Sequence, residues 1–134
     1  MGRQKLIKPL IYLISFIFIT NFLANKFYWY SAVSYFDMIM HFLGGFWVAL
    51  LCVYLYPFKE KSPNVVLEVL AFVLLVGVGW EIYEMLVNSV AAQNPFDYLD
   101  TGSDLFFDLF GGSMAIFYFY KRIMFAKENG VQLK

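Results

Sequence analysis

Long apolar runs alternate with short polar segments along the chain, and these runs define its predicted architecture. Four of them are close to the length of about 17–25 residues that an α-helix needs to cross a bilayer. They cover residues 7–24, 38–56, 65–87 and 105–120. Because the runs are continuous rather than alternating, they predict helices and not the strands of a membrane barrel. The sequence therefore predicts an all-α bundle of four membrane-spanning helices.

The first run also has features of a signal peptide, because a short basic stretch precedes its apolar core. Cleavage after Ala24 would place the large Phe22 where such sites need a small residue. We therefore expect an uncleaved helix. Pro9 is tolerated there because the first helical turn leaves its backbone nitrogen without an intrahelical partner.

Basic side chains are distributed unevenly between the two ends of the predicted helices. Lys26 follows the first run, whereas the other nine lysines and arginines all fall on the opposite side of the membrane. By the positive-inside rule, both termini are expected in the cytoplasm. Aromatic residues gather at both predicted boundaries, as in the aromatic belts of membrane proteins. The nine basic residues are Arg3, Lys5, Lys8, Lys59, Lys61, Lys121, Arg122, Lys127 and Lys134, and Tyr28, Trp29, Tyr30 and Tyr35 lie at the outer boundary.

The composition agrees with a membrane protein. Hydrophobic residues make up 61% of the chain and charged residues 15%, which excludes an ordinary soluble domain. The formal net charge is zero, so bulk basicity does not indicate nucleic acid as a partner. The single cysteine, Cys52, excludes an internal disulfide framework and a cysteine-based zinc site. We expect residues 1–134 to form a single integral membrane domain.

Acidic residues lie within or directly before three of the four runs, at a similar depth. In the predicted orientation this depth is near the extracytoplasmic side, and the single histidine of the chain lies in the same zone. At 100° per residue, the polar residues of each run share one helix face with a glycine, and small residues let helices approach closely in lipid. We therefore expect the three faces to point into the bundle. They are Asp37, His41 and Gly44; Gly77, Glu81 and Glu84; and Asp104, Asp108 and Gly111.

No lysine or arginine in the neighbouring helix segments neutralises these carboxylates. A charge at the centre of a membrane helix costs about 2.5–3.5 kcal/mol, so several like charges need protons, water or a cation. A divalent cation is the simplest solution. One imidazole with several carboxylates suits zinc, manganese, iron or magnesium. We predict that the ligands come from Asp37, His41, Glu81, Asp104 and Asp108.

Each of these residues also has a structural interpretation. Asp37 and Asp104 can interact with the positive ends of their helices, with Ser103 or Asp100 as the N-cap of the fourth helix. His41 can join two helices through a hydrogen bond. The acidic residues deeper in the helices fit such roles less well, because they have no basic partner.

Two segments of the chain resemble each other. Residues 37–45 (DMIMHFLGG) align with residues 104–112 (DLFFDLFGG) at an offset of 67, with three of nine positions identical. The alignment predicts two like-oriented helical hairpins, related by an axis along the membrane normal. The first hairpin has no acidic residues that match Glu81 and Glu84.

Three motifs within residues 36–115 form a recognisable series. They are Asp37-x-x-x-His41-Phe42, Trp80-Glu81-Ile82-Tyr83-Glu84 and Asp100-Thr101-x-x-Asp104-x-x-x-Asp108-x-x-Gly111. The series resembles small bacterial membrane proteins of the YjdF-like family, which are related in style to VanZ-like proteins. VanZ-like proteins usually have a glutamine near Glu84, so the resemblance favours the YjdF-like branch. It implies a location in the cell membrane and a link to the cell envelope, without an established reaction.

Three functions remain open at this stage. The first is a metal-dependent hydrolase or transferase acting on a lipid headgroup or a lipid-linked cell-envelope precursor. Its candidate catalytic residues are Glu84, as a general base, and Glu81. The second is a component of proton- or cation-coupled transport, for which four helices leave little room unless the chain forms a homo-oligomer. The third is a structural or accessory membrane subunit, whose polar residues set helix register.

Overall fold

The computed structural model describes residues 3–56, 63–93 and 95–124, and its regular secondary structure there is helical throughout. Four long helices form most of this described part: α1 (Ile7–Lys26), α3 (Phe36–Leu55), α4 (Val65–Val87) and α5 (Tyr98–Phe119). A 3₁₀ turn, η1 (Arg3–Leu6), leads into α1, and the short α2 (Trp29–Ala32) follows it. Single π-helical turns, η2 (Asn88–Ala92) and η3 (Tyr120–Met124), extend α4 and α5. The all-α prediction is confirmed.

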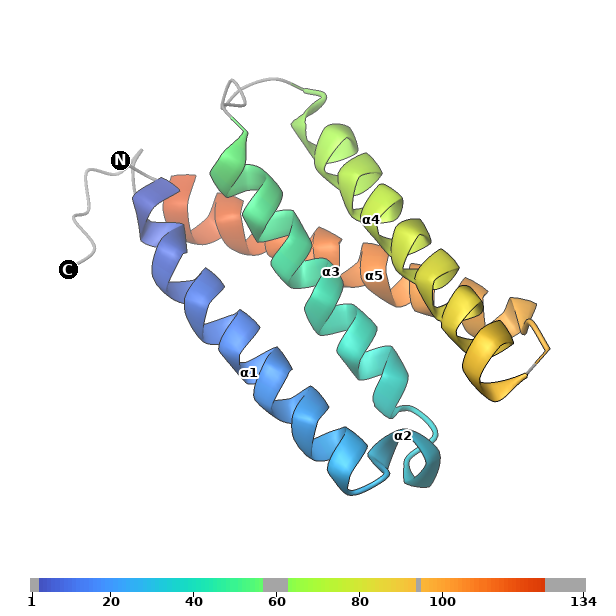
Figure 1. Cartoon of the computed structure of the whole chain (residues 1–134). Coiled ribbons are helices and arrows are strands. Elements are labelled where there is room, and N and C mark those ends of the chain that lie inside the picture. The colour runs from blue at the N-terminus through green and yellow to red at the C-terminus, as the bar shows by residue number, and fades with distance from the viewer. Residues whose placement is uncertain (1–2, 57–62, 94, 125–134) are drawn as a thin grey trace.

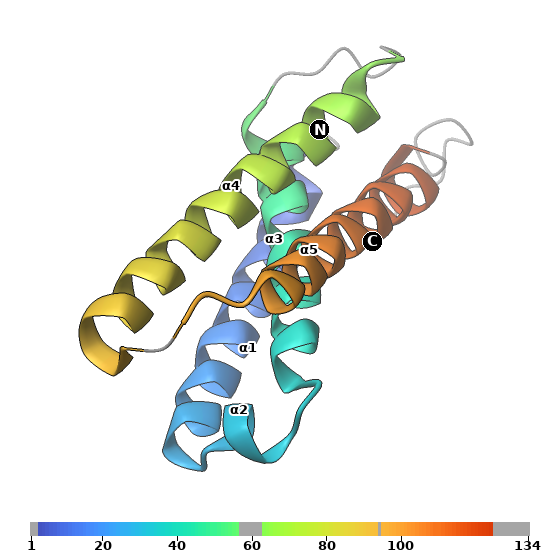
Figure 2. The same cartoon turned by 90° about the vertical axis from the view of Figure 1, so that its right-hand side faces the viewer.

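Helix α3 lies at the centre of the fold and packs against α1, α4 and α5. Figure 1 shows α1 and α4 on opposite sides of α3, and Figure 2 shows α5 crossing α3 on another side. The start of α1 and the end of α5 lie at one end of the molecule, and α2 lies at the other (Figure 1). The beginnings of α3 and α5 therefore lie toward the same end.

Among the described residues, three helical segments are long and apolar enough to cross a membrane. They are Gln4–Lys26, Phe36–Leu55 and Val65–Ala91. Large apolar side chains such as Phe18 and Leu75 are exposed on them, as expected for surfaces that face lipid. Helix α5 contains three aspartates and is not one of these segments. A fourth span at residues 105–120 therefore stays a prediction.

The helix boundaries have local causes. Tyr56, which ends α3, has an extended backbone (φ −92°, ψ 131°) because the following Pro57 disfavours a helical conformation there. The apolar run predicts that the last helix starts near residue 105, but α5 starts at Tyr98. Asp97 is its N-cap, because its side chain accepts hydrogen bonds from the backbone of Leu99 and Asp100. The assignment of Ser103 or Asp100 as the cap is therefore wrong.

Helices α3 and α5 cross with their backbones in contact. A Cβ atom added at Gly45 would collide with the carbonyl of Asp108, and one added at Gly111 would collide with the carbonyl of Phe42. The sequence predicts this contact at Gly44, but a Cβ atom there would meet nothing within 4 Å. The rotation of α3 therefore places Gly45 at the crossing and turns Gly44 away from it. Below the crossing, the buried core includes Ala49, Leu50, Val69, Val73 and Ala115.

The membrane orientation rests on basic residues that the structure describes only in part. Lys59, Lys61, Lys127 and Lys134 lie outside the described residues. The arrangement in Figure 1, with the start of α1 and the end of α5 at one end, agrees with termini on a common side. Which side this is stays a prediction from the charge distribution.

Candidate metal centre

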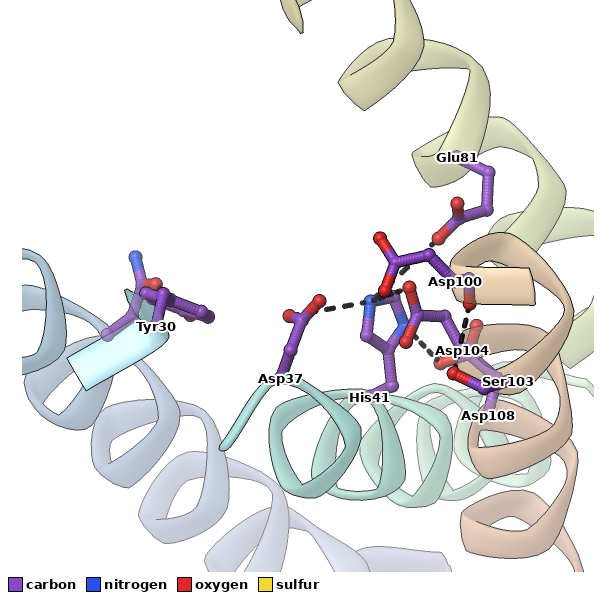
Figure 3. A network of polar contacts seen from close by, with 9 residues as sticks. Tyr30, Asp37, His41, Glu81, Asp100, Ser103, Asp104 and Asp108 are labelled. Atoms are coloured by element: carbon purple, nitrogen blue, oxygen red, sulfur yellow. Dashed lines mark hydrogen bonds and ion pairs between the residues drawn. The ribbon is translucent and has the colours of Figure 1, made fainter. Parts of the chain in front are cut away.

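His41, on α3, lies at the centre of a group of carboxylates that come from three helices (Figure 3). Its side chain is 6% exposed. One ring nitrogen, Nδ1, is 3.2 Å from Oδ1 of Asp108 on α5. The other, Nε2, lies 3.9 Å from Oδ1 of Asp37, 3.8 Å from Oε1 of Glu81 and 3.7 Å from Oδ2 of Asp104. The imidazole thus has one carboxylate on one side and three on the other.

These distances distinguish the two ring nitrogens. The separation at Nδ1 is that of a hydrogen bond, whereas those at Nε2 are too long for one. Two ligands bound about 2.1 Å from a tetrahedral ion lie roughly 3.4 Å apart. Each of the three oxygens therefore lies slightly farther from Nε2 than two ligands of the same ion lie from each other. A histidine that bonds a carboxylate through one nitrogen and faces ligand atoms with the other has the arrangement typical of metal sites.

Three buried carboxylate oxygens in this group have no hydrogen-bond partner among the described residues. They are Oε1 of Glu81, Oδ1 of Asp104 and Oδ2 of Asp108. Asp104 is 1% exposed and Glu81 8%. A buried carboxylate without a partner is strongly destabilising, so these oxygens need a cation or a proton nearby.

Helix periodicity and a glycine bring the group together. Asp37 and His41 are one turn apart on α3, and Asp104 and Asp108 are one turn apart on α5. On α4, Gly77 lies one turn before Glu81, and a Cβ atom there would be 2.5 Å from Oδ2 of Asp108. A larger residue at Gly77 would require the Asp108 side chain to shift, so glycine allows this close approach of α4.

Two sets of residues in the described part of the chain place their donor atoms close enough to hold an ion. Donor atoms of His41, Glu81, Glu84 and Asp104 all lie within 4.8 Å of one another, and those of Asp37, Asp100 and Asp104 meet the same limit. Asp104 belongs to both sets. The structure thus brings four of the five predicted ligands into these sets. The fifth, Asp108, contacts the other ring nitrogen of His41, Nδ1.

Asp100 belongs to this group, although the sequence does not predict it as a ligand. It is expected to cap a helix, whereas in the structure Asp100 lies within α5, one turn before Asp104. The signal that could have found it is the spacing of four residues between Asp100, Asp104 and Asp108, which puts all three on one helix face.

No lysine or arginine in the described part of the chain forms an ion pair with the group. Within the described residues, each close contact of these carboxylates with a basic side chain is with His41. One imidazole cannot balance the charge of four carboxylates, which agrees with the expectation from the sequence.

A cavity of about 710 Å³ adjoins the group, lined by residues of α1, α3 and α4 together with Tyr30 and Asp108. At its polar end, the hydroxyl of Tyr30 on α2 donates a hydrogen bond of 2.6 Å to Oδ1 of Asn21 on α1. Burial, together with the nearby carboxylates Asp37 and Glu84, raises the pKa of Tyr30 to about 12. Tyr30 therefore keeps its proton at neutral pH. No motif marks Tyr30 or Asn21 in the sequence, which assigns Tyr30 only to an aromatic belt.

A family model described as "Predicted membrane protein (DUF2238)" matches residues 3–124, which is nearly the whole chain and includes every residue of the carboxylate group. The chain belongs to this family. As a member of DUF2238 it is a multi-pass membrane protein, in agreement with the composition and the helices. No curated protein and no solved structure matches the chain significantly. The DUF2238 match also covers the first run, which lies outside the YjdF-like resemblance at residues 36–115. Membership of the YjdF-like family stays a prediction.

Proposed function

We propose that this DUF2238 protein binds a divalent metal ion between α3, α4 and α5 and uses it to act on a lipid headgroup or a lipid-linked cell-envelope substrate. One observation carries the proposal. His41 is held by Asp108 through Nδ1, while its Nε2 faces carboxylates from all three helices at 3.7–3.9 Å. This leaves the lone pair of Nε2 directed at the oxygens that would complete a coordination shell.

The ligands that we assign are His41, Glu81 and Asp104, with Asp37 as a further carboxylate facing Nε2. The buried oxygens of Glu81 and Asp104 that have no hydrogen-bond partner support this choice. Asp108 is the hydrogen-bond partner that orients the imidazole. A mixed set of imidazole and carboxylates suits zinc, manganese, iron or magnesium.

The chemistry follows from the ion and from Glu84. A bound divalent ion supplies Lewis acidity to a phosphoryl oxygen or to a water molecule. Glu84 is partly buried, lines the cavity and has a donor atom within 4.8 Å of those of His41 and Glu81. Its carboxylate is in position to take a proton from an attacking water or hydroxyl, as a general base. The class of reaction is therefore hydrolysis or group transfer at the extracytoplasmic side of the membrane.

Elemental analysis of the protein purified in detergent tests the proposal. We expect a stoichiometric divalent metal in the wild type and its loss in His41→Ala and Glu81→Gln. Glu68→Gln is the matched control, because Glu68 is an exposed glutamate in the first turn of the same helix α4. It should keep the metal content of the wild type.

Absence of metal from every preparation, before and after titration with zinc, manganese, iron and magnesium, would contradict the proposal. The carboxylates would then be held by protons. In that case the cluster would be better explained by proton- or cation-coupled transport, or by a structural role between helices.

A further inference from the structure

The cavity beside the carboxylate group changes from polar to apolar in the same direction along three helices. The polar residues lie toward the end that carries α2, and valines and isoleucines lie toward the other end. Val48 follows His41 by seven positions, which corresponds to about 10 Å along α3. The polar and apolar lining residues are Asn21 and Ile14 on α1, His41 and Val48 on α3, and Glu84 and Val73 on α4.

The walls of this cavity belong to the helices that are able to cross a membrane. Residues from all three candidate spans line it. In a bilayer, the apolar part of such a cavity is surrounded by lipid chains, and water does not fill an apolar cavity readily. The occupant that fits the apolar part is therefore a hydrocarbon chain.

The size and charge of the cavity further limit which ligands can occupy it. A volume of about 710 Å³ lies in the range of roughly 300–1,000 Å³ that is usual for sites of drug-sized ligands. This is room for one lipid chain and a small headgroup rather than for a complete two-chain lipid. Among the described residues, no lysine or arginine lines the cavity, so an anionic headgroup would depend on a cation held by the cluster.

We propose that the cavity binds one hydrocarbon chain of a lipid phosphate, with the chain between α1, α3 and α4 and the phosphate at the carboxylate group. The inference rests on the proposed function for its headgroup part, because the divalent ion is the partner of the phosphate. It deepens that function by assigning a substrate class, a single lipid chain that ends in a phosphate.

Gly44 offers a way to fill the cavity without disturbing the helix packing. It lines the cavity, and a Cβ atom added there would meet nothing within 4 Å. Gly79 is the matched control, because it is exposed on α4, does not line the cavity and also has open space around an added Cβ atom. Leucine at either position improves helix propensity, so both variants are expected to fold.

Native mass spectrometry of the detergent-purified protein measures the binding of lysophosphatidate, a single-chain lipid phosphate. We expect one molecule bound to the wild type and to Gly79→Leu. Gly44→Leu should bind it about tenfold more weakly, because leucine occupies the space of several chain carbons. Monoacylglycerol, which lacks the phosphate, and glycerol 3-phosphate, which lacks the chain, should both bind more weakly than lysophosphatidate.

Equal binding of lysophosphatidate to Gly44→Leu and Gly79→Leu, or no binding to the wild type, would overturn the inference. Monoacylglycerol binding as tightly as lysophosphatidate would overturn the assignment of the phosphate, and glycerol 3-phosphate doing so would overturn that of the chain. Metal content is measured on the same preparations. Metal that is retained while the lipid result fails contradicts only the inference, whereas absent metal contradicts the proposed function.

Discussion

Individual side chains determine what the carboxylate group can bind. When His41 is neutral, the 3.2 Å contact with Asp108 makes Nδ1 its protonated nitrogen, because a carboxylate accepts a hydrogen bond and does not donate one. Nε2 then has a free lone pair and faces three carboxylate oxygens. The same imidazole protonated on both nitrogens could only pair with anions. In the neutral ring, the hydrogen bond to Asp108 therefore selects the tautomer whose Nε2 can bind a metal.

Replacing Asp108 by Asn should weaken metal binding without removing the site. The amide keeps the shape and an acceptor oxygen but loses the charge that makes the imidazole a stronger ligand, and such changes typically cost about 10–100-fold in metal affinity. Competition with a chelator measures the affinity, and titration to saturation measures the stoichiometry. Asp108→Ala should be weaker than Asp108→Asn, because it also loses the acceptor.

Complete loss of the metal from Asp108→Asn would instead assign Asp108 as a ligand, as predicted from the sequence. Asp108→Asn would then lose the ion even at saturating metal, as expected for Glu81→Gln. Glu68→Gln again provides the comparison with an acidic residue of α4 that lies outside the group.

At the scale of the helices, the contact between α3 and α5 is what allows the group to form. Gly45 and Gly111 let the two backbones touch, and this contact brings His41 within hydrogen-bonding distance of Asp108. The apolar runs predict the core of all four long helices, but hydropathy does not detect the polar first turns of α5. Those turns are helical because Asp97 caps them, and they carry Asp100 and Asp104 into the group.

Larger side chains at the crossing should destabilise the protein. Gly45→Leu or Gly111→Leu forces the helix backbones apart, and overpacking of this kind typically costs about 1–3 kcal/mol. Thermal unfolding in detergent should show a lower midpoint than for Gly79→Leu, which adds the same side chain at an open position. If all three variants unfold at the same temperature, the close crossing of α3 and α5 is wrong.

At the scale of the whole molecule, the arrangement of the helices relates the two similar segments to each other. His41 and Asp108 occupy equivalent positions of the alignment, 67 residues apart, and they contact each other where α3 and α5 cross. Each of these helices follows a helix that runs in the opposite direction (Figure 1). The carboxylate group lies at this contact, and the relation of the two hairpins by an axis along the membrane normal stays a prediction.

Cysteine labelling should test which side of the membrane carries the group. In a chain with Cys52 replaced by Ala, a cysteine at Ser31 in α2 should react with a membrane-impermeant maleimide in intact cells. A cysteine at Gln4, at the opposite end of α1, should react only after the cells are permeabilised. Both positions are exposed. The reverse pattern would place the group on the cytoplasmic side and contradict the orientation that the basic residues predict.

The sequence by itself determined the helical character of the chain, its membrane environment and the common depth of the acidic residues. The physical reason is that lipid leaves the backbone few ways to satisfy its hydrogen bonds, so long apolar runs must be helical. Helix periodicity then assigns Asp37 and His41, or Asp104 and Asp108, to one face without knowledge of the fold.

Only the tertiary structure decided which atoms meet. The contact of Asp108 with Nδ1, the three carboxylates at Nε2, the choice of Gly45 over Gly44 and the cavity beside the group all depend on how each helix is rotated and how the helices cross. Rotation and crossing arise from side-chain packing between helices that are distant in the sequence. A local pattern predicts which face of a helix is polar, but not which polar atom of another helix lies opposite it.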